Sequence, residues 1–269
     1  MVRWLILGKN IFKELRGNIK ENKSTFAVYI ILRIIVIVAL VVALFRQDFE
    51  TAYVCCLSLI LFLAPAFVEK AFKLYLPSVL EIIVLLFIFA AEILGEIAYF
   101  YVRVPHWDTI LHTVNGFLCA AIGFALVDLL NESKNIKFQL SPIFVAIVAF
   151  CFSMTIGVFW EFLEFGCDMI LKTDMQKDFI VNSISSVALD PANTNKTIHI
   201  NDIRNIAING EALGVNGYID IGLIDTMKDL IVNFIGAVIF SIIGFFYIKN
   251  RGKGKFAEKF IPRVRKAGE

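Results

Sequence analysis

The sequence lacks the short motifs that identify many enzymes and transporters. It contains no P-loop, no Gly-x-Ser-x-Gly, no His-Glu-x-x-His and no Gly-x-Gly-x-x-Gly after a strand, so nothing in it suggests nucleotide chemistry. It also lacks an internal repeat, a low-complexity tract and the paired half-length apolar segments of secondary transporters. The five cysteines lie in or at the edge of apolar runs, without a Cys-x-x-Cys pair. They are expected to pack as small apolar residues and not to form disulfides or a metal site: Cys55, Cys56, Cys119, Cys151 and Cys167.

Apolar side chains, in contrast, are in excess. They make up 58% of the chain, and the mean hydropathy is +0.75. A soluble domain has about 45–50% apolar residues. A water-facing surface could not hide this excess, which therefore points to lipid. The 269 residues are enough for one bundle of about six spans of ~20 residues each, with no second large domain.

Six apolar runs are long enough to cross a bilayer: 26–45, 49–68, 78–100, 107–130, 141–170 and 221–248. Backbone groups in lipid must be paired within their own segment, so each run is predicted to be a helix. The fold class is therefore all-α, a polytopic membrane bundle of six transmembrane helices over 26–248. Pro65 lies inside the second run and is expected to kink or end it. Glycines on the later runs are expected to mark close helix approach: Gly116, Gly123, Gly157, Gly166, Gly236 and Gly244.

Both ends of the chain are basic. Residues 1–25 mix basic and scattered apolar side chains, which predicts an amphipathic helix on the inner membrane surface. A signal peptide is disfavoured because the next run is span-length and lacks a small-residue cleavage site. The tail 249–269 is expected to touch anionic lipid headgroups. Membrane lipids are thus the expected partners, and nothing requires nucleic acid.

The distribution of lysine and arginine predicts the orientation. Eighteen of these residues fall on one side of the proposed spans and six on the other, while Arg33 and Lys228 lie within spans. By the positive-inside rule, both termini are cytoplasmic and the one long loop, 172–220, is outside. The expected location is a bacterial cytoplasmic membrane. Two short alternating pieces, 197–200 and 205–208, with Asn209-Gly210 nearby, suggest a small β-hairpin cap. An unstructured polar connector is the alternative.

Ionisable residues gather at four helix ends that share the loop side of the membrane. At ~1.5 Å per residue, Glu96, His112, Glu161 and Asp229 come out at one depth, about 27–31 Å from the inner ends. The four ends hold the following residues: Glu92 and Glu96; Asp108 and His112; Glu161, Glu164 and Asp168; Asp225, Lys228 and Asp229.

The spacing within each set, three or four residues, places its members on one helix face. Crowded carboxylates raise one another's pKa unless a proton or cation lies among them, and oxygen ligands with one imidazole suit a divalent cation. The alternative is a set of solvated helix caps and internal ion pairs, in which Lys228 is a counter-charge. The candidate metal ligands are Asp108, His112, Glu161, Glu164, Asp168, Asp225 and Asp229. Glu161, His112 and Asp229 are the candidate catalytic residues.

Three stretches resemble the YjdF-like family of bacterial inner-membrane proteins. They are Trp107-Asp108-Thr109-Ile110-Leu111-His112 with Asn115-Gly116, Phe159-Trp160-Glu161-Phe162 through Asp168, and Asp225-Thr226-Met227-Lys228-Asp229 with Gly236. The resemblance covers roughly 105–240. It implies a fold and a residue cluster without an activity, because the family is a domain of unknown function.

Two classes of function stay open. In the first, the cluster holds a divalent metal or a protonated carboxylate and acts on a lipid or envelope substrate. In the second, it is the coupling site of an ion or proton transporter or channel. Below the cluster there are few polar candidates for a transport route beyond Glu81, Arg33 and Asp128, which favours the first class. A structural accessory subunit is a third alternative.

Overall fold

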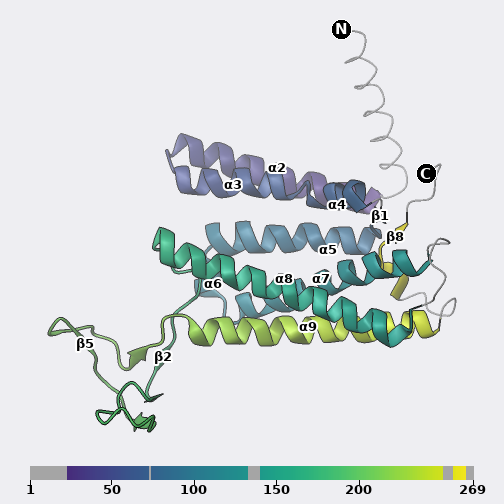
Figure 1. Ribbon diagram of the computed structural model, residues 1–269. Coiled ribbons are helices and arrows are strands. Elements are labelled where there is room, and N and C mark those ends of the chain that lie inside the picture. The colour runs from purple at the N-terminus through teal and green to yellow at the C-terminus, as the bar shows by residue number, and fades with distance from the viewer. Residues whose placement is uncertain (1–22, 73, 133–139, 251–256, 265–269) are drawn as a thin grey trace. The chain divides into compact units, whose positions relative to one another are not determined.

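The computed structural model describes residues 23–72, 74–132, 140–250 and 257–264. Residues 1–22 of the predicted amphipathic helix over 1–25, and residues 251–256 and 265–269 of the basic tail, lie outside these ranges, whereas residues 23–25 belong to α2. The described chain is mainly helical, in the order shown in Figure 1. The α-helices are α2 (Lys23–Phe45), α3 (Phe49–Leu61), α4 (Ala64–Phe72), α5 (Ser78–Phe89), α6 (Phe100–Arg103), α7 (Trp107–Glu132), α8 (Pro142–Leu171) and α9 (Leu223–Lys249).

Six helical segments in the described chain are long and apolar enough to cross a membrane. They run over Ser24–Phe45, Phe49–Ala71, Ser78–Ile97, Trp107–Asp128, Pro142–Leu171 and Leu223–Lys249. Each bound lies within three residues of the sequence prediction. The all-α, six-span fold class is therefore confirmed.

Apolar side chains on the outside of these helices fit a lipid surrounding. On α2, Ile31, Ile34 and Val38 are more than half exposed, whereas Leu32 and Val36 are buried against neighbouring helices. A water-soluble helix would present polar residues on that open face. Lipid tails are as apolar as these side chains, so their exposure costs nothing in a bilayer.

The second span is broken where its proline predicts. Helix α3 ends at Leu61, and α4 begins at Ala64 with Pro65 as its second residue. Proline has no backbone N–H, and its ring clashes with the preceding turn in a continuous helix. At the start of a helix both problems disappear, so α4 restarts there.

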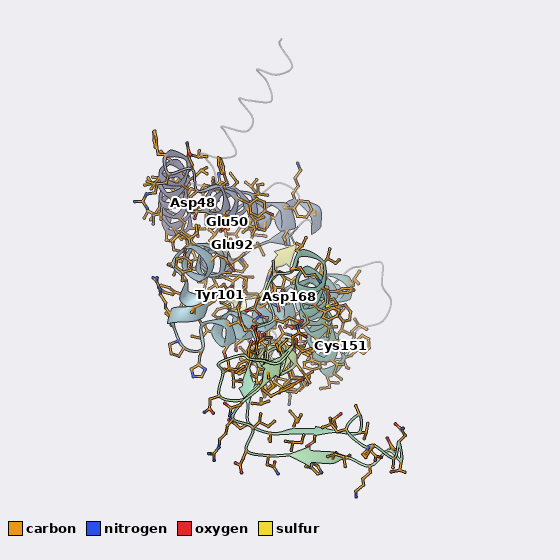
Figure 2. All side chains as sticks on the ribbon, turned by 90° about the vertical axis from the view of Figure 1, so that its left-hand side faces the viewer. Asp48, Glu50, Glu92, Tyr101, Cys151 and Asp168 are labelled. Carbon is orange, nitrogen blue, oxygen red and sulfur yellow. The ribbon has the colours of Figure 1, made fainter. Side chains whose placement is uncertain are left out.

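The third span contains a π-helix, η1 (Ala90–Ile97), which follows α5 directly. It holds Glu92, which is labelled in Figure 2, and the ring of Tyr101 packs against Gly95, where a β-carbon would overlap it. The indole N–H of Trp107 donates to the Ala90 carbonyl at 3.3 Å. The sequence did not reveal this element, because a π turn has no distinct apolar periodicity over eight residues.

The chain divides into two compact units, residues 1–154 with 232–269, and residues 155–231. The first unit, the bundle unit, has a core of small and aromatic side chains from α7, α8 and α9. In it α7 and α9 lie backbone to backbone, because a β-carbon at Gly116 would overlap the Asn233 carbonyl, and one at Gly236 the Thr113 carbonyl. The predicted close approach is confirmed at these glycines, whereas at Gly166 it is wrong, because no neighbouring part of the described chain comes within 4 Å of a β-carbon there. The buried core residues are Ala120, Ala121, Phe124, Val145, Ala149, Ala237, Phe240 and Ile261.

The last described residues fold back into the bundle unit. The 3-10 helix η2 (Ala257–Lys259) leads to β8 (Arg263–Val264), which pairs antiparallel with β1 (Leu74–Tyr75). Ile261 is 1% exposed within the core, and the Phe260 ring lies 5.7 Å from that of Phe117. This part of the tail is therefore packed against the helices.

Replacing Ile261 by alanine is expected to destabilise the protein by about 2–4 kcal/mol, because it leaves a cavity in the core. Thermal unfolding of the detergent-solubilised protein measures the effect. Lys259→Ala, on the exposed side of η2, is the matched control and should have little effect. Equal midpoints for the two variants would contradict the docked tail.

The second unit, the loop unit, contains the end of α8, the long loop and the start of α9. Its strands are β2 (Ile180–Val181), β3 (Ile184–Ser186), β4 (Ile198–Ile200), β5 (Ala207–Ile208), β6 (Glu211–Ala212) and β7 (Tyr218–Ile219). They form three antiparallel pairs, β2–β7, β3–β4 and β5–β6. The loop is therefore structured, and an unstructured connector is excluded over these residues.

A hairpin is present at Asn209-Gly210, as the sequence predicts. Both residues have positive φ, 54° and 88°, which is the backbone of a tight two-residue turn between β5 and β6. The other alternating piece, 197–200, pairs with β3 and not with 205–208. Elsewhere the Asp190 carboxylate accepts backbone N–H bonds from Ala192, Thr194 and Lys196. The Thr194 hydroxyl and these amides hold the pKa of Asp190 below its usual range.

Candidate functional site

Three buried carboxylates meet in the loop unit. Glu161 and Glu164 on α8 and Asp229 on α9 each offer an oxygen, and these three oxygens lie within 4.8 Å of one another. The side chains are 4%, 7% and 3% exposed. We call this group the carboxylate triad.

The local sequence of α8 explains how the triad is presented. Glu161 and Glu164 are three residues apart and so share one face, whereas Phe162 and Leu163 between them are each more than 60% exposed. This turn therefore places its acids inside and its apolar side chains outside. The half-exposed Trp160 donates its indole N–H to Glu164 Oε1 at 2.7 Å, which fixes that carboxylate.

The triad is electrostatically unfavourable if all its members are ionised. At an effective dielectric constant of about 20, two charges this far apart repel by about 3 kcal/mol. The summed repulsion of three such pairs would exceed the stabilisation that a few hydrogen bonds supply. A proton shared among the acids, or a cation between them, removes the repulsion. The oxygen-only donor set fits a hard divalent cation such as Mg²⁺, Mn²⁺ or Ca²⁺.

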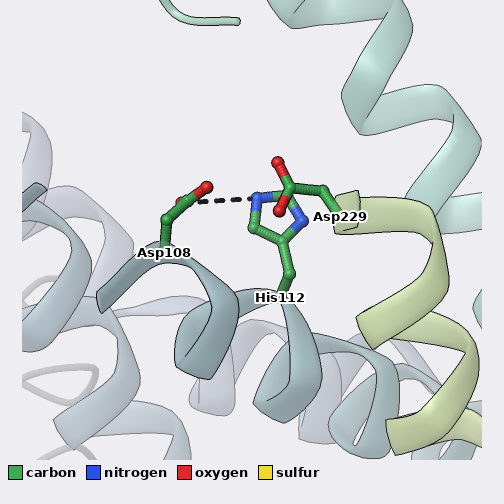
Figure 3. Close-up of side chains that lie close together, drawn as sticks. All are labelled: Asp108, His112 and Asp229. Carbon is green, nitrogen blue, oxygen red and sulfur yellow. Dashed lines mark ion pairs between the residues drawn. The ribbon is translucent and has the colours of Figure 1, made fainter. Parts of the chain in front are cut away.

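The predicted pair on α7 is present in the bundle unit. His112 Nε2 lies 3.5 Å from Asp108 Oδ1, one helical turn away, as the dashed line in Figure 3 shows. His112 is 8% exposed. A carboxylate at one ring nitrogen orients the imidazole and favours a tautomer, the usual arrangement of a histidine that acts as base or ligand.

Two of the predicted ligands are engaged elsewhere. Asp168, at the end of α8 (Figure 2), accepts the N–H groups of Met175 and Gln176 at 2.7 and 2.8 Å. Asp225 Oδ2 accepts the Lys177 N–H at 2.8 Å. Neither acid belongs to the triad.

The Lys228 side chain contacts an aromatic ring of the loop. Its ammonium nitrogen is 3.4 Å from the centroid of the Phe179 ring in the loop. The counter-charge suggested by the sequence is thus turned toward an aromatic ring. Glu92 and Glu96 lie on the π-helix of the bundle unit.

The bundle unit contains a polar layer that the spacing of charged residues did not predict. Asn233, one turn along α9 from Asp229, is 1% exposed and accepts from Asn115 Nδ2 at 3.4 Å. Ser153 donates to the Gly116 carbonyl at 2.7 Å. A buried asparagine inside an apolar run was the available signal, because such residues are costly in a membrane. Further along α9 the same face continues as Ala237 and Phe240, which are fully buried in the apolar core.

Comparison with known proteins adds the family. No curated protein and no solved structure matches the chain. The model of a family described as a predicted membrane protein (DUF2238) matches residues 28–250, and the YjdF-like resemblance is consistent with it. That match spans all six candidate spans almost completely, including the carboxylate triad and the Asp108–His112 pair. The chain therefore belongs to the DUF2238 family of predicted membrane proteins.

Proposed function

We propose that the carboxylate triad binds a divalent cation and that the loaded site acts on a lipid or envelope substrate. The observation that carries the proposal is the convergence of three buried carboxylate oxygens within 4.8 Å. Glu161, Glu164 and Asp229 would hold the ion. A bound divalent ion supplies Lewis acidity and lowers the pKa of bound water. Glu161, Asp229 and, on α7, His112 remain the candidate catalytic residues.

Transport fits the bundle less well. Beyond Asn233 on α9, Ala237 and Phe240 are fully buried in an apolar core, and Ser241 is the next buried polar side chain on this helix. An ion moving on along this face would meet few polar partners. Arg33, one of the few intramembrane charges, lies over the Tyr29 ring, with its guanidinium carbon 4.2 Å from the centroid. A site accessible from one side of the membrane is the better account.

The proposal is tested by metal analysis of the detergent-purified protein. After dialysis against Mn²⁺, the unchanged protein should retain close to one ion per chain, and Glu161→Gln should retain far less. Glu50→Gln, at the exposed start of α3, is the control and should match the unchanged protein. Absence of saturable Mn²⁺, Mg²⁺ or Ca²⁺ binding would refute the proposal, as would identical metal content in all three proteins.

The loop side of the membrane is a second part of the proposal. We propose that the protein lies in a bacterial cytoplasmic membrane with both termini in the cytoplasm and the long loop outside, an orientation that the bias of lysine and arginine supports. In a cysteine-free background, Asn209→Cys at the β5–β6 turn should react with a membrane-impermeant maleimide in intact cells. Lys259→Cys should react only after permeabilisation. The reverse pattern would invert the orientation and place the site on the cytoplasmic side.

A further inference from the structure

A short segment of the loop crosses from α8 to α9 beside the triad. Residues 173–179, which we call the strap, follow the end of α8. Their first residues form hydrogen bonds with the Asp168 carboxylate. That carboxylate accepts from the Thr173 hydroxyl at 2.7 Å and from the Met175 and Gln176 amides. Three hydrogen bonds to one side chain fix the start of the strap on the end of α8.

The other half of the strap is fixed on the start of α9. The Lys177 amide donates to Asp225, and the Gln176 side chain donates to the Thr226 hydroxyl at 2.5 Å. The Phe179 amide donates to Asp220, at 2.7 Å. The strap is thus bonded to both helices that carry the triad.

A glycine next to α9 allows this approach. Gly222 has φ of 84°, and a β-carbon there would come within 2.7 Å of the Gln176 β-carbon. A larger residue would be strained in this conformation and would also push the strap away. The close approach of the strap to the start of α9 therefore depends on the glycine at position 222.

The two clamping acids lie one turn from the triad. Asp168 follows Glu164 by four residues on α8, and Asp225 precedes Asp229 by four on α9. We infer that Asp168 and Asp225 are positioning residues, which clamp the strap across the two helix ends and so set the separation at which the triad binds its cation. The inference rests on the proposed function. It differs from the sequence prediction, in which both acids are ligands.

The strap opposes the electrostatic repulsion within the carboxylate triad. When the three acids are ionised and no cation lies between them, their repulsion drives the ends of α8 and α9 apart. A cross-link by hydrogen bonds one turn away resists that separation and keeps the donor oxygens near their bound geometry. Second-sphere partners of this kind typically alter metal affinity by 10–100-fold.

Two substitutions of Asp225 distinguish a positioning residue that holds the strap from a residue that binds the cation directly. Asparagine at 225 keeps an oxygen that accepts the Lys177 N–H but loses the charge that a ligand supplies, whereas alanine loses both. Asp225→Ala and Asp168→Ala are expected to weaken Mn²⁺ binding at least tenfold. Asp225→Asn should stay within about threefold of the unchanged protein, because a neutral acceptor keeps most of the bond. Asp190→Ala is the matched control, since Asp190 also holds backbone amides in this loop, but those amides belong to Ala192 and Thr194, outside the strap.

A second measurement does not depend on metal. Spin labels at Phe165 on α8 and Met227 on α9, both about half exposed, report the distance between the helix ends in a cysteine-free background. Asp225→Ala should broaden the distance distribution in the presence of a chelator. Asp225→Asn and Asp190→Ala should leave it unchanged.

The outcomes distinguish this inference from the proposed function. If Asp225→Asn loses Mn²⁺ as completely as the alanine variant while the label distances stay unchanged, Asp225 is a ligand and the inference is overturned. It is equally overturned if Asp225→Ala and Asp168→Ala match Asp190→Ala in both measurements. If the unchanged protein binds no cation, the proposed function fails, and the label distances still decide whether the strap fixes the helix ends.

Discussion

Without metal, Glu161→Gln is expected to unfold at a higher temperature than the unchanged protein, and with saturating Mn²⁺ at a lower one. Removing one acid from the triad eliminates two repulsions of about 3 kcal/mol each, of which proton uptake already relieves a part. A gain of about 1–2 kcal/mol in the free energy of unfolding should remain, which is less than the stabilisation that Mn²⁺ supplies. At a hundred times its dissociation constant, Mn²⁺ adds about 2.7 kcal/mol to a protein that binds it. Because Glu161→Gln binds Mn²⁺ poorly, the ion should add little to the free energy of unfolding of this variant.

Thermal unfolding in detergent, with a chelator or with Mn²⁺, measures whether the order of the two unfolding midpoints reverses. Asp229→Asn should behave in the same way, because Asp229 belongs to the same group. Both variants should insert into the membrane normally and fail to restore whatever phenotype a deletion produces. The exposed Glu50→Gln should follow the unchanged protein in both conditions. If the order of the midpoints is the same with and without metal, the triad is not a cation site.

Gly236→Ala is expected to destabilise the bundle by about 3 kcal/mol. The added β-carbon would overlap the Thr113 carbonyl oxygen and approach the Phe117 amide nitrogen to 2.9 Å. These are backbone atoms of a helix, which cannot rotate away as a side chain would. Helices α7 and α9 would have to separate, and the bond between Asn115 and Asn233 would be lost.

Gly166→Ala on α8 is the control for this prediction. Among the residues that the structure describes, no neighbouring atom outside its own helix turn lies within 4 Å of its β-carbon position, and alanine favours the helix by about 1 kcal/mol over glycine. Its midpoint should therefore stay the same or rise. Gly116→Ala, which would overlap the Asn233 carbonyl, should resemble Gly236→Ala. Equal stability of the Gly166 and Gly236 variants would show that α7 and α9 do not pack through these glycines.

The candidate site was predictable in part from the sequence. The spacing of Glu161 and Glu164 within an apolar run, and the position of Asp229 near the same end of the last span, predicted buried acids on neighbouring helices. The structure brings these three together. Asp168 and Asp225 fit the same spacing rule, yet both hold the strap. Spacing on a helix could not separate the two roles, because the partners come from a loop whose path no periodicity encodes.

By itself, the sequence determined the number, the helical state and the approximate ends of the spans. These depend on local properties, namely apolar length, unpaired backbone groups in lipid and the missing N–H of Pro65. Only the tertiary structure decided that Ile261 returns to the core and that β4 pairs with β3. It also selected which acids meet in the triad and which hold the loop. Each of these depends on contacts between residues distant in the chain, where burial and hydrogen bonding choose among partners of the same residue type.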